Sequence, residues 1–316
     1  MKKMLSLVLA LCMVLCCGAA MAEDKVYEIG VLQLVQHEAL DQATQGFVDA
    51  LTEKLGDKVK FDIKNAAGDT GNCNSIATTF DSNEVDLIMA NATPALQAAM
   101  NATGTIPILG TSVTDYATAL GVTEGWTGVT GLNVSGTSDL APLDGQAAMI
   151  KELFPEAKKV ALLYCSAEPN SVYQVTVIAE HLKALGYETE EFSFADSNDV
   201  ASVSQAAADN ADVIYIPTDN TAASYKETIA NVVIPAKVPV VAGESGICSG
   251  CGVATLSISY YDLGYATGLM AYDVLVNGAD ISTMPIQSAP NFTKMYNAAN
   301  VAELGLTMPA DYLPIE

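Results

Sequence analysis

The sequence predicts an α/β protein built from two doubly wound parallel-sheet units in series. Short apolar runs alternate with helical patterns along most of the chain. The runs are continuous rather than alternating, which is typical of strands buried on both faces of a parallel sheet. The alternation breaks in a stretch rich in Gly, Thr and Ser at 126–139 and then restarts. A length of 316 residues also favours two domains.

The first unit follows this pattern from residue 26 onward. An apolar run predicts its first strand, and an amphipathic pattern predicts the helix that follows. The expected strands are 26–35, 59–63, 85–89 and 106–109, and the expected helices are 39–55, 74–80 and 94–100. Strands joined by helices in this order form a doubly wound sheet.

The second unit repeats the alternation after residue 142. Its expected strands are 160–164, 188–192, 213–216 and 238–241, and its expected helices are 143–153, 171–185, 200–209 and 222–233. Two such units in series predict a ligand cleft between them.

The last quarter of the chain predicts further crossings between the units. An extended stretch at 252–256 precedes a long helix at 260–276, and another extended stretch at 291–297 precedes a helix at 298–304. Together with 126–139 this gives a hinge of three crossings that would allow the units to close. The expected N-terminal lobe is 23–132 plus 254–288, and the expected C-terminal lobe is 133–253 plus 289–316.

The first 22 residues have the pattern of a secretory signal peptide. Lys2 and Lys3 precede an apolar run, and Ala20-Met21-Ala22 is a small-x-small pattern with the expected cleavage after Ala22. A retained membrane anchor is the alternative, although about 20 apolar residues are needed to span. A lipid-modified Cys16 or Cys17 is a further alternative. We therefore expect an exported, extracytoplasmic protein.

The charge excludes several classes of partner. The formal net charge is -23, and all 14 basic residues are Lys because the chain has no Arg. Nucleic acids and anionic membrane surfaces would repel such a chain. Without a guanidinium fork, an acidic ligand must be held by Lys, hydroxyls, backbone N–H groups or helix N-termini.

The cysteines give no sign of a metal or redox centre. Three of the seven lie in the predicted signal, which leaves Cys73, Cys165, Cys248 and Cys251. Cys248 and Cys251 could close a local disulfide outside the cytoplasm. Zinc or redox chemistry would need a second ligand pair or a thioredoxin-like context, and the sequence shows neither. We expect no metal and no cofactor.

Several segments resemble the tryptophan/tyrosine-type substrate-binding proteins of ABC importers. The likeness covers the chain after the signal, in order, and rests on 29–41 (Ile-Gly-Val-Leu-Gln-Leu-Val-Gln-His-Glu-Ala-Leu-Asp), 45–47, 85–88, 92–95, 106–108, 113–115, 169–172, 216–221 (Ile-Pro-Thr-Asp-Asn-Thr) and 259–264. It implies a type I periplasmic-binding-protein fold, an aromatic amino acid as ligand and an ABC permease as partner. The chain departs from the family at 243–246, where such proteins tend to carry two consecutive acids, and at Cys248 and Cys251.

The candidate ligand residues follow strands, because the crevice of a doubly wound sheet lies at the carboxyl ends of its strands. Asp219 is the predicted partner of a ligand ammonium, and its alternative role is to cap the following helix. Ser and Thr hydroxyls are the predicted partners of the carboxylate, and Leu40, Ala92 and Val113 are candidates for the ring pocket. The predicted binding residues are Gln36, His37, Ala92, Thr93, Thr111, Ser112, Val113, Asn170, Ser171, Asp219, Asn220, Glu244 and Ser245.

The sequence therefore predicts a monomeric solute-binding protein rather than an enzyme. His37 is the only His near the expected cleft, and the chain lacks a Gly-x-Ser-x-Gly nucleophile elbow. The alternative is a receptor for another small polar ligand, such as a sugar, a nucleoside or a branched-chain amino acid.

Overall fold

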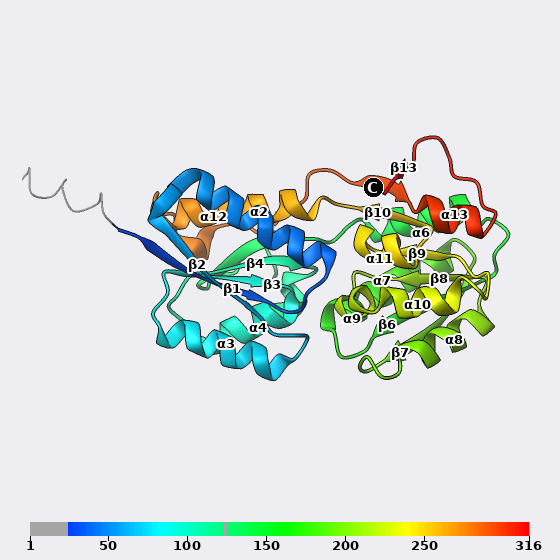
Figure 1. Cartoon of the computed structure of the whole chain (residues 1–316), viewed down its shortest axis with the longest axis horizontal. Coiled ribbons are helices and arrows are strands. Elements are labelled where there is room, and N and C mark those ends of the chain that lie inside the picture. The colour runs from blue at the N-terminus through cyan, green and yellow to red at the C-terminus, as the bar shows by residue number, and fades with distance from the viewer. Residues whose placement is uncertain (1–24, 123–124, 316) are drawn as a thin grey trace, which may run out of the picture.

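The computed structural model describes residues 25–122 and 125–315, which form two lobes lying side by side (Figure 1). Each lobe is a mostly parallel sheet covered by helices on both faces, so the predicted fold class is confirmed. The predicted signal peptide, with Cys16 and Cys17, lies outside the described residues. Within the described ranges, no helix combines the length and the apolar character needed to cross a membrane.

Lobe 1 contains a six-stranded sheet of order β11-β5-β4-β3-β1-β2, in which every pairing is parallel. Its strands are β1 (Tyr27–Gln33), β2 (Val59–Asn65), β3 (Leu87–Asn91), β4 (Ile108–Val113), β5 (Val134–Ser138) and β11 (Gln287–Ser288). Its helices are α2 (Glu38–Leu55), α3 (Thr70–Ser82), α4 (Thr93–Ala102), α5 (Tyr116–Leu120) and α12 (Tyr260–Leu275), with short 3-10 turns η1 (Gly56–Lys58) and η2 (Ile281–Thr283). One apolar cluster joins the sheet to α3 and α4, and another joins it to α2 and α12.

Lobe 2 contains a seven-stranded sheet of order β13-β12-β10-β9-β8-β6-β7, in which only the β10–β12 pairing is antiparallel. Its strands are β6 (Lys159–Cys165), β7 (Glu188–Phe194), β8 (Val213–Ile216), β9 (Val240–Ala242), β10 (Ala254–Ser257), β12 (Thr293–Tyr296) and β13 (Leu313–Pro314). Its helices are α6 (Leu143–Leu153), α7 (Pro169–Ala184), α8 (Val200–Asn210), α9 (Asn220–Ser224), α10 (Lys226–Val233), α11 (Ser245–Gly250) and α13 (Ala298–Glu303). Helices α6 and α7 pack on one face of the sheet, and α8 and α10 pack on the other.

Both sheets change winding direction at an equivalent point. In lobe 1 the first strand, β1, lies between β2 and β3, and in lobe 2 β6 lies between β7 and β8. Loops that leave the carboxyl ends of such neighbouring strands diverge to opposite faces and leave a crevice. The predicted site segments after β1, β3, β6 and β8 therefore lie at the crevices of the two lobes.

The chain crosses between the lobes three times, at 139–142, 258–259 and 289–292 (Figure 1). The first two crossings come later than predicted. Strand β5 pairs with β4 and β11, so residues 134–138 belong to lobe 1, and β10 pairs with β9 and β12, so residues 254–257 belong to lobe 2. The glycine-rich stretch ending at 132 is a turn region before β5, where Gly128 and Gly131 have positive φ.

Two short helices, α5 and α11, were not predicted, and the predicted helix 222–233 is divided at Tyr225 into α9 and α10. Tyr225 has φ -113° and ψ 23°, outside the helical region. The four cysteines in the described ranges have free, buried thiols, so the Cys248–Cys251 bond considered from sequence is not formed in this structure.

Candidate functional site

A small enclosed cavity, here called the inner cavity, lies between the two lobes. Its lining comes from the loop and helix after β1, the first crossing, the segments after β8 and β9, and the start of α12: His37, Ala39, Leu40, Asp139, Thr218, Asp219, Asn220, Ala223, Glu244 and Tyr260. Its volume is about 10 Å³, which is room for about one water molecule. Four of the predicted binding residues, His37, Asp219, Asn220 and Glu244, meet at this cavity.

Three carboxylates line the inner cavity, and among the described residues its lining contains no lysine. Asp139, Asp219 and Glu244 are 3%, 1% and 2% exposed. Burial raises the pKa of Asp139 to about 6 and that of Glu244 to about 7. The pKa of Asp219 is raised by burial and by the negative charge of Glu168. Buried carboxylates without a counterion favour the approach of a cation.

Asp219 is held by three donors of its own lobe. Its carboxylate accepts hydrogen bonds from the backbone N–H of Ala222, the backbone N–H of Cys165 and the hydroxyl of Ser171, each at 2.7 Å. The first of these bonds is the N-cap of α9. The capping role considered from sequence is confirmed, and the role in binding an ammonium stays a prediction.

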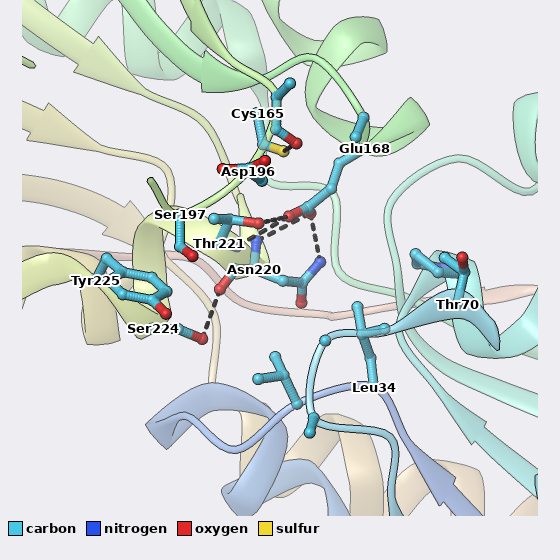
Figure 2. Close-up of a pocket in the computed structure, with 16 residues that line it drawn as sticks. Leu34, Thr70, Cys165, Glu168, Asp196, Ser197, Asn220, Thr221, Ser224 and Tyr225 are labelled. Carbon is cyan, nitrogen blue, oxygen red and sulfur yellow. Dashed lines mark hydrogen bonds between the residues drawn. The ribbon is translucent and has the colours of Figure 1, made fainter. Parts of the chain in front are cut away.

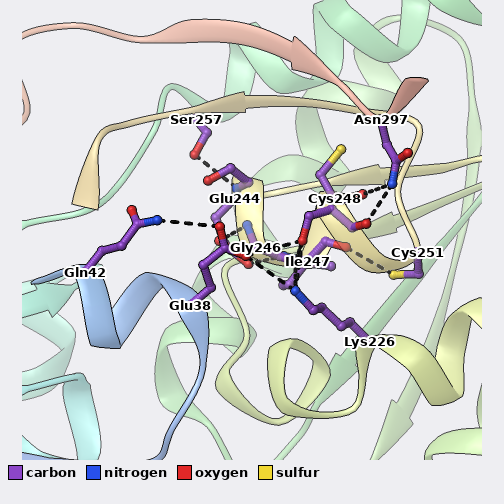
Figure 3. Close-up of polar contacts among 12 residues, drawn as sticks. Glu38, Gln42, Lys226, Glu244, Gly246, Ile247, Cys248, Cys251, Ser257 and Asn297 are labelled. Carbon is purple, nitrogen blue, oxygen red and sulfur yellow. Dashed lines mark hydrogen bonds and ion pairs between the residues drawn. The ribbon is translucent and has the colours of Figure 1, made fainter. Parts of the chain in front are cut away.

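Glu244 also caps a helix. Its side chain accepts hydrogen bonds from the backbone N–H groups of Gly246 and Ile247 at the start of α11 (Figure 3). The neighbouring predicted residue, Ser245, donates its backbone N–H to the hydroxyl of Ser257 at 3.1 Å. Glu244 therefore lines the inner cavity while the backbone N–H groups at the start of α11 hold its carboxylate in place.

Asp139, which the sequence reasoning did not select, follows β5 in the first crossing. Its Oδ2 accepts a hydrogen bond from the hydroxyl of Tyr260 at 3.0 Å. Its Oδ1 is buried and has no hydrogen-bond partner among the described residues. Its position at the carboxyl end of a strand marks it as a candidate. The sequence pattern of 126–139, however, predicts a crossing and not a strand.

Two hydroxyls of lobe 1 are buried and lack partners in the described part of the chain. Thr93 begins α4, and Ser112 lies near the end of β4; both have an unpartnered Oγ. Ser112 has φ 53°, and Ala92, just before α4, has φ 89°. Positive φ at non-glycine residues is strained and concentrates at functional sites. The N-terminus of α4 also offers free backbone N–H groups to an anion.

Other predicted residues serve the lobes themselves. The hydroxyl of Thr111 lies 3.1 Å from that of Thr137, which lies 2.8 Å from that of Thr267. Ala92 and Val113 are packed in the core of lobe 1. Gln36 is exposed and borders a separate surface groove. Neither these four predicted residues nor Thr93, Ser112, Asn170, Ser171 and Ser245 line the inner cavity.

A larger opening, here called the outer cleft, has a volume of about 480 Å³ and lies between loops of both lobes (Figure 2). Glu168, before α7, accepts hydrogen bonds there from the backbone N–H groups and side chains of Asn220 and Thr221, and from the side chain of Asn170. Glu168 was not predicted, and it fixes the loop that carries Asn220. Asn220 lines both the outer cleft and the inner cavity.

Direct contacts join the lobes across this region. His37 Nε2 lies 3.2 Å from Asn220 Oδ1, and burial lowers the pKa of His37. Glu38 of α2 lies 3.5 Å from the ammonium of Lys226 and 3.4 Å from the hydroxyl of Ser249 (Figure 3). Lys226 also donates to the carbonyl oxygen of Gly246 and the hydroxyl of Ser249. The lobes are thus in contact at the mouth of the site.

Two lobes joined by three crossings, with strand ends facing each other across an enclosed cavity, define a class of two-lobed binding protein. The sequence matches the family model for "ABC transporter substrate binding protein" over residues 28–314. The chain therefore belongs to the family of ABC transporter substrate-binding proteins, as its sequence motifs indicated.

Individual relatives agree with this assignment. The chain is 38% identical over 265 residues to a tyrosine-binding protein of Clostridioides difficile, covering 83% of this chain and 76% of the relative. It is similar to an ABC domain from Streptococcus pneumonia in complex with L-Trp, with a TM-score of 0.85, 33% identity and coverage of 90% and 96% of the two chains. It is also similar to the ligand-free, open structure of a substrate-binding protein with adhesive properties from Clostridium difficile, with a TM-score of 0.70, 36% identity and coverage of 92% and 99%.

The cross-lobe contacts of His37 and Glu38 show that the two lobes touch each other in the present structure.

Proposed function

We propose that this protein is the extracytoplasmic receptor of an ABC importer and that it binds an aromatic amino acid, Trp, Tyr or Phe, between its lobes. The observation that carries the proposal is the inner cavity, where three buried carboxylates suited to an ammonium converge between the lobes. The names of two relatives, a tyrosine-binding protein and a complex with L-Trp, support the aromatic class.

The ammonium of the ligand would be held among the carboxylates of the inner cavity. Asp139, Asp219 and Glu244 are all buried there, and a cation between them would offset their mutual repulsion. A charge-assisted hydrogen bond contributes about 1.5 to 3 kcal/mol, more than a neutral one. The site thus favours a ligand with a primary amine over a neutral sugar.

The carboxylate of the ligand would be held by lobe 1. Thr93 and Ser112 each bring a buried hydroxyl without a partner in the described residues, and Thr93 begins the ten-residue helix α4. A helix N-terminus binds anions through its free N–H groups and its dipole. Such an arrangement would hold a carboxylate by hydroxyls and backbone N–H groups, as the absence of Arg from the chain requires.

The lobes must separate to admit such a ligand. A volume of about 10 Å³ is far smaller than an amino acid, and the three crossings provide the hinge for opening. Leu40, Ala223 and the ring of Tyr260 supply apolar walls against which an aromatic side chain would pack when the lobes close again. Burial of an aromatic side chain contributes about 4 to 6 kcal/mol.

We further propose that the protein acts outside the cytoplasm. Residues 1–22 would direct export, with Cys16 or Cys17 as an alternative lipid attachment point. A monomer would then deliver its ligand to a membrane permease. Membership of the substrate-binding protein family supports a transport role rather than catalysis.

A thermal-shift screen of residues 23–316 against amino acids, nucleosides and sugars tests the proposal. We expect Trp, Tyr or Phe to raise the melting temperature by roughly 5 °C at 100 times the Kd, because saturation at that level adds about 2.7 kcal/mol. Calorimetry should then give a Kd near the micromolar range. Stabilisation by sugars, nucleosides or branched-chain amino acids alone would contradict the proposal.

A further inference from the structure

The three carboxylates of the inner cavity differ in how much of their hydrogen-bonding capacity the protein already uses. Asp219 accepts three hydrogen bonds and Glu244 accepts two, and in both cases the donors include the first N–H groups of a helix. Asp139 accepts one well-formed hydrogen bond, from Tyr260 through Oδ2 at 3.0 Å, and the nearby side chain of Thr114 also lowers its pKa. Its Oδ1 is left without a partner in the described chain.

A buried carboxylate oxygen without a donor is unfavourable for the folded protein. An unsatisfied buried polar group costs about 1 to 3 kcal/mol, and more when it is charged. Asp139 is 3% exposed, so bulk water does not reach it freely, and it lines the inner cavity. Thr93 and Ser112 of lobe 1 also carry a buried hydroxyl oxygen without a partner in the described residues, but neither lines the inner cavity.

The position of Asp139 adds a second argument. Asp139 lies in the first crossing, directly after β5, and its partner Tyr260 begins α12 directly after the second crossing. The Asp139–Tyr260 hydrogen bond therefore joins two hinge segments. Asp219 and Glu244, in contrast, belong to lobe 2 and move with it.

We propose that Asp139 Oδ1 accepts the hydrogen bond from the ligand ammonium and that Asp139 is therefore the residue that selects ligands with an amino group. This inference rests on the proposed function. Asp219 and Glu244 then hold the starts of α9 and α11 in place and add negative potential around the ammonium. The charge of the ligand is neutralised at the hinge rather than on either moving lobe.

The test compares an aromatic amino acid with the matching 3-arylpropionate, which has the same ring and carboxylate but no amino group. The ratio of the two dissociation constants measures selection for the amine and cancels effects on the carboxylate site. It would be determined by calorimetry, with competition for the weaker ligand, in the wild type, Asp139→Asn, Asp219→Asn and the control Asp144→Asn. Asp144 is exposed on α6, so its variant reports the effect of losing one surface charge.

We expect Asp139→Asn to reduce the preference for the amino acid at least about tenfold, in line with the loss of one charge-assisted hydrogen bond. Asp144→Asn should leave the preference within about twofold of the wild type. If Asp139→Asn does not fold, Asp139→Ser removes the same charge with a smaller side chain. The ratio of dissociation constants in that variant then tests the inference.

An unchanged ratio in a folded Asp139 variant would overturn the inference, as would a loss confined to Asp219→Asn, which would identify Asp219 as the anchor. These outcomes differ from failure of the proposed function. In that case the wild-type protein itself would bind none of the aromatic amino acids.

Discussion

Asp139 and Glu244 keep their protons to unusually high pH because both are buried in the wall of the inner cavity. The pKa values are about 6 and about 7, and that of Asp219 is raised as well. Between about pH 4 and pH 7 these three carboxylates therefore bind more protons in the folded protein than in the unfolded chain, and the lowered pKa of the single His37 offsets only part of this difference. The free energy of unfolding of the ligand-free protein should fall as pH rises through this range.

Ligand affinity should change in the opposite direction. An ammonium binds the ionised carboxylates, so the Kd of an aromatic amino acid should decrease from pH 5 to pH 8, and binding near pH 6 should release protons. His37, Glu168, Tyr116, Tyr260 and Lys226 also act on these carboxylates or face the cavity. Calorimetry at pH 5, 6, 7 and 8, in buffers of different ionisation enthalpy, measures both effects.

The 3-arylpropionate is the control for this pH series. It carries no ammonium, so ionisation of the three carboxylates should weaken its binding or leave it unchanged as pH rises. Amino-acid affinity that is flat or declines from pH 5 to pH 8 would contradict an anchor made of cavity carboxylates.

At the scale of elements, the contact between α2 and α12 depends on glycine. A Cβ atom at Gly264 would lie 1.9 Å from the backbone oxygen of Ala43, and one at Gly46 would lie 2.1 Å from the backbone oxygen of Tyr261. No rotamer change relieves a clash with backbone. The backbones of the two helices therefore lie closer together than they could with any residue other than glycine at these positions.

We predict that Gly264→Ala lowers the free energy of unfolding by about 1 to 3 kcal/mol, because the helices must separate, although Ala alone would favour a helix. Urea unfolding followed by circular dichroism measures the change. The matched control is Gly104→Ala: a Cβ there meets nothing within 4 Å, so its effect should stay within about 0.5 kcal/mol. Equal stability of the two variants would contradict this account of the α2–α12 contact.

At the scale of the whole molecule, the pair Glu38–Lys226 is the one ion pair that joins the lobes among the described residues. It is partly exposed, with side-chain exposures of 42% and 24%, so its contribution to closure should be modest. A double-mutant cycle with Glu38→Gln and Lys226→Met should give a coupling of about 0.2 to 1 kcal/mol in ligand binding, expressed mainly as faster dissociation.

Stopped-flow dissociation of the bound ligand provides the rates for this cycle. Lys294→Met removes the ion pairs with Glu152 and Asp311 inside lobe 2 and is the control. It should not change the dissociation rate. Additive effects of the Glu38 and Lys226 variants would show that the pair does not stabilise the closed form.

The sequence was sufficient for the architecture because its apolar runs and helical patterns are local features. It was less informative where the residue types of a segment do not indicate its structure or its contacts. Helix α11 carries Gly246 and Gly250, which disfavour helices, and it forms because Glu244 caps it and the sheet packs against it. Thr111 lies near a strand end like the other candidates, yet its hydroxyl faces Thr137 inside the lobe.

Asp139 and Glu168 illustrate the same limit for the site. Asp139 depends on the pairing of β5 with lobe 1, which local pattern does not reveal. Glu168 depends on donors from Asn220 and Thr221, far away in sequence. His37, Asp219, Asn220 and Glu244 could be placed from sequence because each directly follows a strand that was predicted in about the right place.

The close contact of α2 and α12 also has a consequence for how the chain folds. Tyr265 of α12 donates a hydrogen bond to Glu53 of α2, 212 residues earlier in the chain. All of lobe 2 up to β10 lies between these helices, so lobe 1 cannot finish its core until that intervening chain has been made. A contact of such long sequence separation slows folding and leaves the inner face of α2 uncovered during synthesis. Lobe 1 therefore cannot complete its core until α12 has been synthesised, although its first strand is the first to emerge.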